Sequence, residues 1–502
     1  MLVGAACSSD PTDTDPDPAP SGGEAAPVTG PWPSANLDLA GTRATTDSPI
    51  DSSTVDDLEV AWTFEVPDGG MAGALATTPV IVDDRVWVAD LSSDVYALDL
   101  ADGSEVLRIE NGFGTFGPNG VAVDQRHVYV APDTESVAAY DASTGEQVWR
   151  TPLTDEAGGA VNMQPLVVDG TVLAATSSLG RPGSRGTLFA LGATSGDVEW
   201  SFDTIESPDL WGRPDINAGG GSWYPPAVDL DARRVYWGTS NPYPWPGLEA
   251  FPNGSSRPGD NRWTDSTLAL DLDTGELVWG HQHRPHDLFD LDTALAALTT
   301  DAEGRQVVIA SGKFGRVVAL DPASGDVRWD TPVGVHENDD LDSFEGELTV
   351  YPGYVGGVTT PMAVADGVVY VAVVNAPTEL PSPSLSFEPD APAFAVRNGQ
   401  MVAVDVDDGS IVWDVEVDGQ AFGGATVVND LVFGSTLTGE LFALDRATGA
   451  TTWSTQLDTG INAWPAVAGD TLVVPAGVTT GDHPPQIVAY RLASGPTATS
   501  AP

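Results

Sequence analysis

Apolar and polar residues alternate along this chain in short runs that end in one recurring pattern. The pattern is Ala, any residue and Asp, then three residues, Gly, three residues and Trp. Copies, some with one substitution, begin at Ala97, Ala139, Ala190, Ala269, Ala319, Ala403 and Ala443. Each copy predicts a β-hairpin, because alternation is typical of strands, Asp caps turn amides and Gly supplies a positive φ. The Trp suits a position wedged between neighbouring sheets.

Each hairpin follows another predicted strand pair, as in residues 80–88 and 165–173, and four antiparallel strands make a propeller blade. A last, incomplete copy at 489–495 lacks its Trp strand. The missing strand stands at the other end of the chain, in residues 58–64 with Trp62. Joining the two leaves no open sheet edge. The sequence therefore predicts an all-β, eight-bladed β-propeller of four-stranded antiparallel blades, closed by the N-terminal strand.

The two ends of the chain differ from the repeats. Residues 8–30 and 496–502 are rich in Pro, Thr and Ala, with Asp and Gly in the first of them, so we expect both to be disordered around a propeller at 31–495. Residues 1–7 end in Cys7, the only cysteine, and resemble the end of a bacterial lipoprotein signal. The charged and apolar parts of a signal peptide are missing, which a late start codon would explain. We expect an extracytoplasmic, lipid-anchored protein; the alternative is a stray cysteine.

The charge balance restricts the partners. With 73 acidic and 20 basic residues the net charge is -53. This argues against nucleic acid, whose phosphates need Lys and Arg, and against anionic membrane surfaces. No run of eighteen apolar residues exists, so contact with a membrane is expected through a lipid anchor only.

Candidate chemistry lies in residues 281–292, which hold three of the 6 His and three carboxylates, and at Lys313, the only lysine. Burial and neighbouring charges can shift the pKa of a lysine, unlike that of an arginine. Taken alone, these residues are better explained as a polar loop and an incidental surface lysine. The case for chemistry therefore depends on their surroundings.

The repeat resembles the tryptophan-docking motif of the pyrroloquinoline quinone (PQQ) dehydrogenases, the eight-bladed quinoprotein alcohol dehydrogenase family. The likeness runs from about Trp32 to Gly495. It includes residues 41–62, 219–224 (Gly-Gly-Gly-Ser-Trp-Tyr), 238–245, 258–261 and 285–292. The resemblance implies oxidation of a small alcohol or polyol by PQQ and a calcium or lanthanide ion, with electrons passed to an unidentified acceptor. That chemistry needs a hard cation, a base within hydrogen-bond reach and an electron sink.

By motif, the family's base corresponds to Asp290, with Phe289 in place of the usual Trp. The cation that holds the quinone oxygen and the base corresponds to Lys313. Asn241 matches the metal-binding Asn, and Asp292 stands where lanthanide-using members carry an extra Asp. The resemblance thus implies Asn241, Asp290 and Asp292 as metal ligands.

The cofactor cradle matches less well. Trp223 or Tyr224 is expected as the aromatic floor, but Arg181 stands closest to the position of the metal-binding Glu. A cation there opposes a metal ion, so Arg181 is expected either to turn away or to take over part of the metal's role by contacting a cofactor carboxylate. The residues that replace the family's other quinone contacts are Ala76, Asn119 and Asn162.

This combination of matching site residues and altered cradle residues is consistent with two alternative functions. The first is an exported quinoprotein-type dehydrogenase, indicated by the four matching residues at 241, 290, 292 and 313. The second is a lipid-anchored propeller that binds proteins or cell-wall material without catalysis, indicated by the altered cradle. His281, His283 and His286 are candidate metal ligands, but their spacing favours a hydrogen-bonding loop.

Overall fold

The computed structural model describes residues 30–67, 74–115, 117–154, 158–384, 398–479 and 483–493. The predicted lipoprotein site, nearly all of the predicted linker and the C-terminal tail lie outside the described residues. Apart from a 3-10 turn at Val55–Asp57, the regular secondary structure of the described part is β-strand. No helix in those ranges is long and apolar enough to span a lipid bilayer.

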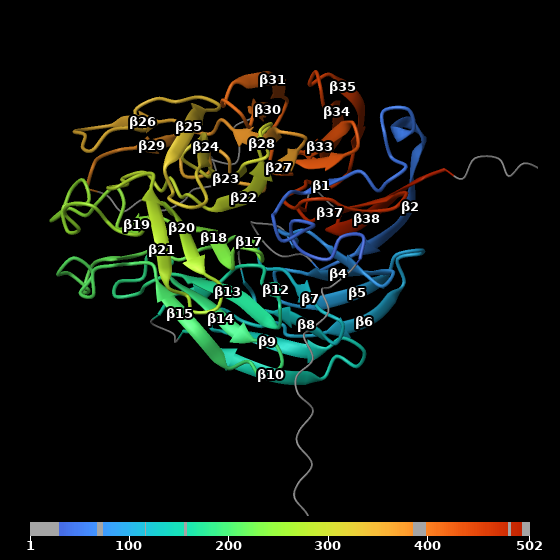
Figure 1. The fold of residues 1–502 in the computed structure, drawn as a ribbon, viewed down its shortest axis with the longest axis horizontal. Helices are drawn as coiled ribbons and strands as arrows, with labels where there is room; N and C mark the ends of the chain where they lie inside the picture. The colour runs from blue at the N-terminus through green and yellow to red at the C-terminus, as the bar shows by residue number, and fades with distance from the viewer. Residues whose placement is uncertain are drawn as a thin grey trace, which may run out of the picture.

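Eight four-stranded antiparallel sheets follow one another around a ring in chain order (Figure 1). The first four blades are β3 (Val80–Val82), β4 (Arg85–Ala89), β5 (Val95–Asp99) and β6 (Glu105–Ile109); β7 (Ala122–Val123), β8 (His127–Val130), β9 (Ser136–Asp141) and β10 (Gln147–Pro152); β12 (Leu166–Val168), β13 (Thr171–Ser177), β14 (Thr187–Gly192) and β15 (Val198–Asp203); β17 (Ala227–Asp229), β18 (Arg234–Gly238), β20 (Ser266–Asp271) and β21 (Leu277–Gln282).

The remaining four blades complete the ring. They are β22 (Leu295–Thr300), β23 (Gln306–Ser311), β24 (Arg316–Leu320) and β25 (Val327–Pro332); β27 (Ala363–Ala365), β28 (Val368–Val374), β30 (Gly399–Asp405) and β31 (Ile411–Val417); β32 (Thr426–Val428), β33 (Leu431–Ser435), β34 (Glu440–Asp445) and β35 (Thr451–Gln456); β36 (Ala466–Ala468), β37 (Thr471–Ala476), β38 (Gln486–Leu492) and β2 (Leu58–Glu65).

Short additional strands decorate the blades. β1 (Ala44–Thr45) runs parallel to β32, and β11 (Ala160–Val161) pairs with β13. Two antiparallel pairs lie outside the blades: β16 (Ala218–Gly219) with β19 (Pro242–Tyr243), and β26 (Leu348–Val350) with β29 (Thr378–Leu380). These pairs brace the long segments that follow Trp200 and Trp329, and both segments contribute residues to the cavity described below.

The repeated pattern forms the predicted hairpins. Its seven glycines have φ between 70° and 75°. In the β9–β10 turn, the Asp141 carboxylate accepts the amides of Ser143 and Thr144, as the pattern predicts. The glycine is needed for a second reason, because the Trp of the preceding blade lies flat on it. A Cβ on Gly275, for example, would lie 2.6 Å from the Trp200 ring.

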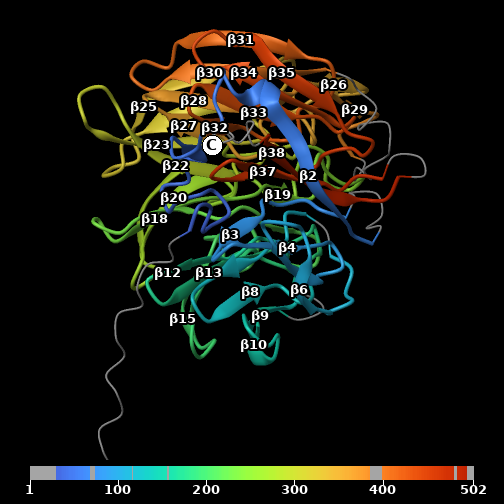
Figure 2. The same ribbon diagram turned by 90° about the vertical axis from the view of Figure 1, so that its right-hand side faces the viewer.

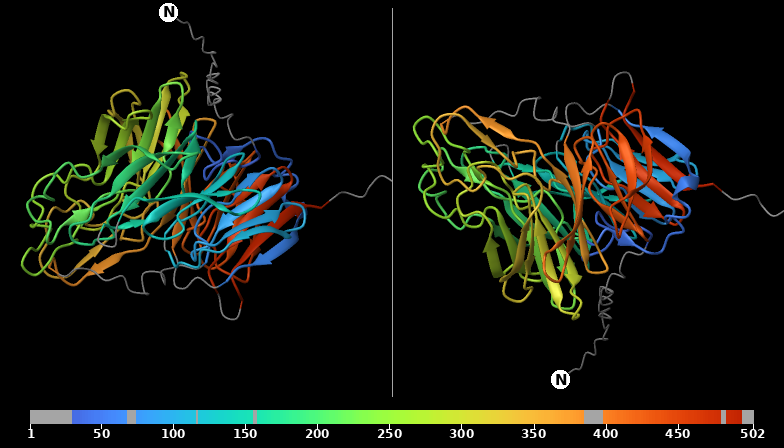
Figure 3. Two further views of the ribbon diagram at one scale, coloured as in Figure 1. Left: turned by 90° about the horizontal axis from the view of Figure 1, so that it is seen from below. Right: turned by 90° about the horizontal axis from the view of Figure 1, so that it is seen from above.

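The predicted closure of the ring is confirmed. β2 pairs antiparallel with β38, and Trp62 stands opposite Ala489, as each repeat Trp stands opposite its Ala. The Trp62 Nε1 donates to the carbonyl of Leu100 in the first blade at 2.9 Å. The first blade thus lies against the last, where blue and red strands are side by side in Figures 2 and 3. The first and last sheets share one apolar core.

The N-terminal segment also braces the ring through Arg43, which is fully buried. Its guanidinium donates to backbone carbonyls of Ala35, Ala425 and Pro465. These partners belong to the first part of the chain and to its last two blades, so one side chain joins the two ends.

Candidate functional site

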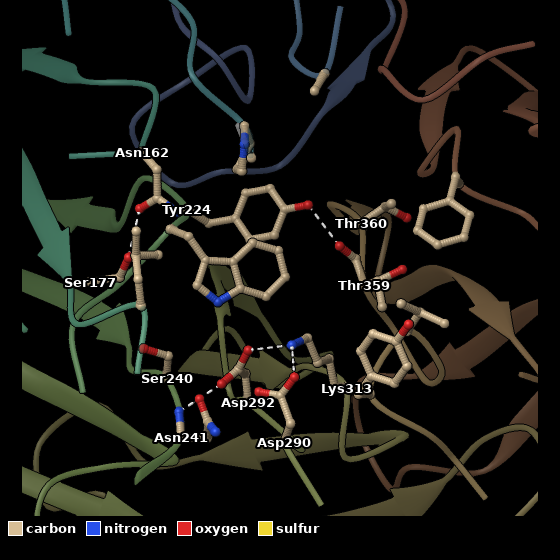
Figure 4. A pocket seen from close by; sticks show the side chains of 18 of the residues that line it. Asn162, Ser177, Tyr224, Ser240, Asn241, Asp290, Asp292, Lys313, Thr359 and Thr360 are labelled. Atoms are coloured by element: carbon tan, nitrogen blue, oxygen red, sulfur yellow. Dashed lines mark hydrogen bonds and ion pairs between the residues drawn. The ribbon is translucent and has the colours of Figure 1, made fainter. Parts of the chain in front are cut away.

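A cavity of about 780 Å³ opens where the loops of successive blades meet. Its lining runs around the whole ring, from Ala76 through Ser177, Asp290 and Thr359 to Val478, so the cavity lies on the ring axis. Figure 4 shows that side chains from several blades point into this one space. Asn241, Asp290, Asp292, Lys313, Trp223 and Tyr224, the residues matched from sequence, all line it.

Three charged side chains form a compact group at one wall. The Lys313 Nζ lies 3.0 Å from an oxygen of Asp290 and 2.8 Å from an oxygen of Asp292 (Figure 4). The second oxygen of Asp292 accepts the backbone amide of Asn241 at 2.6 Å. Lys313 and Asp290 are 14% and 15% exposed and Asp292 is 4% exposed, so the group is screened from bulk water but open to the cavity.

Burial and mutual charge set the electrostatics of this group. Burial raises the pKa of Asp290 well above its usual range; Lys313 opposes that increase and Asp292 adds to it. Burial alone would lower the pKa of Lys313, but Asp290 and Asp292 outweigh it and its pKa is raised. One ammonium therefore lies between two carboxyl groups, and burial together with Asp292 favours the protonated form of Asp290.

Backbone geometry explains how the charged residues meet. Asp290 has φ 62°, in the left-handed region that a non-glycine residue seldom adopts. The Asp287 carboxylate accepts the amides of Phe289 and Leu291 on either side of it, which holds this turn. Lys313 arrives on the loop between β23 and β24, where Gly312 packs on the backbone of Asp292. A Cβ on Gly312 would lie 2.1 Å from the Asp292 carbonyl oxygen.

Aromatic rings form another wall. Trp223 and Tyr224 have ring centroids 4.6 Å apart, and the Lys313 Nζ lies 5.4 Å from the centroid of Trp223. The Tyr224 hydroxyl donates to the carbonyl of Thr359 at 2.6 Å, and its ring lies 5.5 Å from that of Trp464. The two aromatic residues chosen from sequence are thus adjacent to the charged group.

Four buried polar atoms of this cavity have no hydrogen-bond partner. They are Trp223 Nε1, Trp464 Nε1, Thr359 Oγ1 and Thr360 Oγ1. Leaving a buried donor unpaired costs roughly 1–3 kcal/mol. Such a cluster is expected where a polar ligand supplies the missing partners.

The structure does not bring Arg181 to the cavity. Arg181 is exposed, and its guanidinium donates to the carbonyl of Gly159 at 3.3 Å. The amide of Arg181 donates to the Ser178 carbonyl, which begins a turn that carries the side chain away. Ser177 and Ser178 line the cavity instead. The side chain of Arg181 therefore turns away from the cavity, which is one of the two outcomes expected from the sequence.

The other substituted positions divide in two. Ala76 and Asn162 line the cavity, and Ser177 donates to the Asn162 amide oxygen at 3.0 Å. Asn119 is fully buried outside the lining and donates to the carbonyl of Ala131 at 3.3 Å. Of the three clustered histidines, His283 bonds Thr267 and His286 faces two backbone carbonyls.

Sequence reasoning missed the wall formed by Tyr354, Thr359, Thr360, Phe422, Leu437 and Trp464. These residues come from loops between strands, which carry no periodicity. One signal was available for Trp464, because it is a tryptophan outside the docking position of the repeat.

Known proteins resemble this chain along most of its length. The family model described as the glucose, ethanol and alcohol dehydrogenase β-propeller domain matches residues 32–119 and 151–313. A second model, described as outer membrane protein assembly factor BamB, matches 257–376 and 397–498. The chain is 26% identical to the quinohemoprotein alcohol dehydrogenase of Comamonas testosteroni over 87% of this chain and 70% of that protein. It is 27% identical to the putative dehydrogenase XoxF of Paracoccus denitrificans, over 86% and 83%.

Solved structures show the same architecture. The crystal structure of the Comamonas testosteroni enzyme superposes with a TM-score of 0.80 at 24% identity, covering 93% of this chain and 81% of that one. A europium-containing methanol dehydrogenase gives 0.77 at 20% identity, covering 92% and 98%. Together with the matched family model, these relatives show that the chain belongs to the PQQ-dependent, alcohol dehydrogenase-like family of eight-bladed propellers.

Proposed function

We propose that this protein is an exported quinoprotein-type dehydrogenase that oxidises an alcohol or polyol with PQQ and a bound metal ion. One observation carries the proposal: Asp290 lies 3.0 Å from the chain's only lysine, in an axial cavity that also holds Asn241 and Asp292. A base, a fixed cation and oxygen donors in one enclosed pocket are the parts that alcohol oxidation needs.

The cavity suits PQQ, a planar, polycyclic molecule with carboxylates. Trp223 offers a flat ring beside the charged group, and Thr359, Thr360 and Trp464 hold unpaired donors around the same space. PQQ bound there would supply the electron acceptor for a hydride from the substrate. Trp223 and the hydroxyls would bind and orient it, and Lys313 would stabilise negative charge on its reduced quinone oxygen.

The donor set also suits a hard cation. Asn241, Asp290 and Asp292 offer amide and carboxylate oxygens, which calcium and lanthanides prefer to nitrogen or sulfur. A positive ion would favour the ionised form of Asp290, whose pKa burial and Asp292 raise. Ser177 and Ser178, rather than a cationic Arg181, face this space, which removes the objection that the sequence raised.

The chain's own residues would handle the proton. Asp290 would accept the hydroxyl proton of the substrate in its ionised form; burial raises the pKa of Asp290, and the neighbouring Lys313 ammonium opposes that rise, as a bound cation would. Asp292 would hold Lys313 from the other side, so that the ammonium stays between the two carboxylates. The partial burial of all three side chains limits competition from water.

The remaining assignments complete the proposal. Residues 1–502 hold one cysteine, Cys7, and hence no covalent haem motif, and an unidentified acceptor would receive the electrons. Export and a lipid anchor at Cys7 are inferred from residues outside the described part. The net charge of -53 continues to argue against nucleic acid.

Reconstitution tests the proposal. Purified protein is mixed with PQQ and either calcium or a lanthanide, and binding is followed by absorbance and oxidation by dye reduction over a panel of alcohols and polyols. We expect metal-dependent binding and turnover, with Asp290→Asn binding PQQ but not reducing the dye. Asp273→Asn, in the exposed β20–β21 turn, is the matched control. Absence of PQQ binding with every metal would overturn the proposal.

The second candidate is a non-catalytic, lipid-anchored scaffold that binds proteins or cell-wall material. Two points favour it: the BamB family model matches the second half of the chain, and the motif resemblance places Ala76 and Asn162, both in the cavity lining, at positions where the family holds the quinone. A protein that binds no PQQ but retains a partner after Asp290→Asn would fit this function.

A further inference from the structure

We propose that His336 is a positioning residue, and that a chain of contacts through Asp339, Arg284 and Asp287 holds the Lys313 loop against the Asp290 turn. None of these four side chains lines the cavity. They lie behind it, and together they connect the two loops that meet at the 3.0 Å contact between Lys313 and Asp290.

The chain of contacts begins at the Asp290 turn. Asp287 has a fully buried side chain whose two oxygens accept the Phe289 amide at 3.0 Å and the Leu291 amide at 2.8 Å. These bonds flank Asp290 and stabilise its positive φ. The Arg284 Nε in turn donates to Asp287 at 3.3 Å.

Arg284 carries the connection to the next blade. Its Nη2 donates to the backbone carbonyl of Asp339, in the segment that follows β25. Arg284 is 17% exposed, so its bonds are partly protected from water. The Asp290 turn is thereby fixed to the loop that contains His336.

His336 completes the connection to Lys313. Its Nδ1 lies 2.8 Å from the Asp339 carboxylate and its Nε2 lies 2.9 Å from the carbonyl oxygen of Gly315. Gly315 stands two residues after Lys313 and has φ 66°. A Cβ on it would lie 3.1 Å from the His336 ring, so the loop and the imidazole are closely packed.

Both ring nitrogens of His336 face acceptors, and only the imidazolium form has two N–H donors. The hydrogen bond that His336 donates to the Asp339 carboxylate raises the pKa of His336; burial and Arg316 oppose this, and the Gly315 carbonyl adds to it. Asp339 lies on the same loop as His336, and Arg316 is at the start of β24. The pKa of His336 is raised in the folded state. The two bonds of His336, to Asp339 and Gly315, are therefore both present below the ordinary histidine pKa, and they weaken as pH rises through the raised pKa of His336.

The link itself is testable in the full chain without PQQ or metal. Hydrogen exchange of residues 312–317 is measured between about pH 6 and about pH 9, as protection factors, in wild type and His336→Gln. In wild type, we expect the protection of residues 312–317 to fall as pH rises. In His336→Gln, we expect the protection to be low at the lower pH as well as at the higher pH. Nitrogen NMR should show both ring nitrogens of His336 protonated at the lower pH.

The matched control is His127→Gln. His127 and Asp124 form another histidine–aspartate pair three residues apart, 3.7 Å from each other, in the second blade. The hydrogen-exchange profile of residues 312–317 in His127→Gln should equal that of wild type. Equal protection in His336→Gln and wild type, or pH-independent protection in wild type, would overturn the proposal.

The catalytic consequence rests on the proposed function. In reconstituted protein, His336→Gln should lower kcat roughly tenfold with little change in KM, because it displaces Lys313 without touching the substrate. The wild-type advantage should shrink as pH rises, and Asp339→Asn should behave like His336→Gln. If reconstitution fails while exchange and NMR behave as expected, the proposed function is wrong and the positioning link stands. An unchanged kcat and pH profile in an active His336→Gln enzyme would reject the positioning role.

Discussion

Two sets of buried tryptophans divide this molecule into a closed framework and an open site. Six repeat tryptophans, at 62, 149, 200, 279, 329 and 413, each donate Nε1–H to a backbone carbonyl of the next blade at 2.7 to 3.0 Å. Trp223 and Trp464 face the axial cavity, and neither Nε1 has a partner.

The difference shows where the chain has satisfied its own polar groups. The framework donors are paired within the protein, so they serve stability, whereas the cavity donors are available to a ligand. Among these eight tryptophans, Nε1–H is bonded within the protein at the repeat positions and unpaired in the cavity wall. Experiments can test this division by changing one set at a time.

The largest effect is expected within the site. Asp290→Asn should reduce dye-linked alcohol oxidation by roughly a hundredfold or more, because a general base contributes about 10²–10⁴-fold. The framework should be unaffected, since Asp290 bonds only to Lys313 among its described hydrogen-bond partners. The measurement is kcat in reconstituted protein beside the urea midpoint of the unloaded protein. A large fall in the urea midpoint would contradict the division between site and framework.

The reverse experiment breaks the framework at its closure. Trp62→Ala removes a buried indole and its bond to Leu100, and we expect a loss of about 3–5 kcal/mol in the free energy of unfolding. The exchange protection of the first and last blades should fall most, because Trp62 joins them.

Deleting residues 1–29 is the control for this change, because these residues precede the described propeller. Urea unfolding of that truncation should match the full chain. Equal stability of Trp62→Ala and wild type would mean that the last blade does not depend on the N-terminal strand.

These two experiments also mark what the sequence could predict. The framework was predictable because each blade repeats its own turn chemistry, with Gly at a fixed distance from Asp and Trp. The ring closure was predictable because the last repeat lacks its Trp strand, and the strand with Trp62 at the other end of the chain supplies it. The charged group of Asp290 and Lys313 was predictable from motif resemblance, because residues 285–292 match a short motif of the family without gaps.

The rest of the site depends on contacts between loops that are distant in sequence. Thr359 and Trp464 reach the cavity from irregular segments, with no local pattern to indicate it. Which of the two expected positions Arg181 adopts is decided by the turn that begins with its amide bond to the Ser178 carbonyl, and the sequence left that choice open. Physical reasoning from sequence works here where structure is local and periodic, and fails where tertiary packing decides.

A smaller effect distinguishes the two tryptophan sets directly. Trp200→Phe should destabilise the unloaded protein by roughly 1–3 kcal/mol, because it removes the bond to Leu272 and leaves that carbonyl without the indole. Trp464→Phe should cost less, since its Nε1 has no bond to lose. Affinity for PQQ should show the opposite order, with only Trp464→Phe weakening it. Equal losses of stability in both variants would remove the distinction.

The smallest effect concerns the surface, whose charge surrounds both regions. Repulsion among 73 acidic residues, offset by only 20 basic ones, should weaken as salt screens it, so the melting temperature should rise by roughly a few degrees between low and molar salt. The buried Lys313 contacts should respond much less, because partly buried pairs are poorly screened. NaCl and KCl should act alike, since screening depends on ionic strength, whereas sulfate would add a separate exclusion effect. Melting curves of the unloaded protein, recorded together with exchange of residues 312–317, compare the two responses. A flat melting temperature would mean that the surface charges are too widely spread to matter, and a salt-sensitive Lys313 loop would mean that the site is more open to water than its burial indicates.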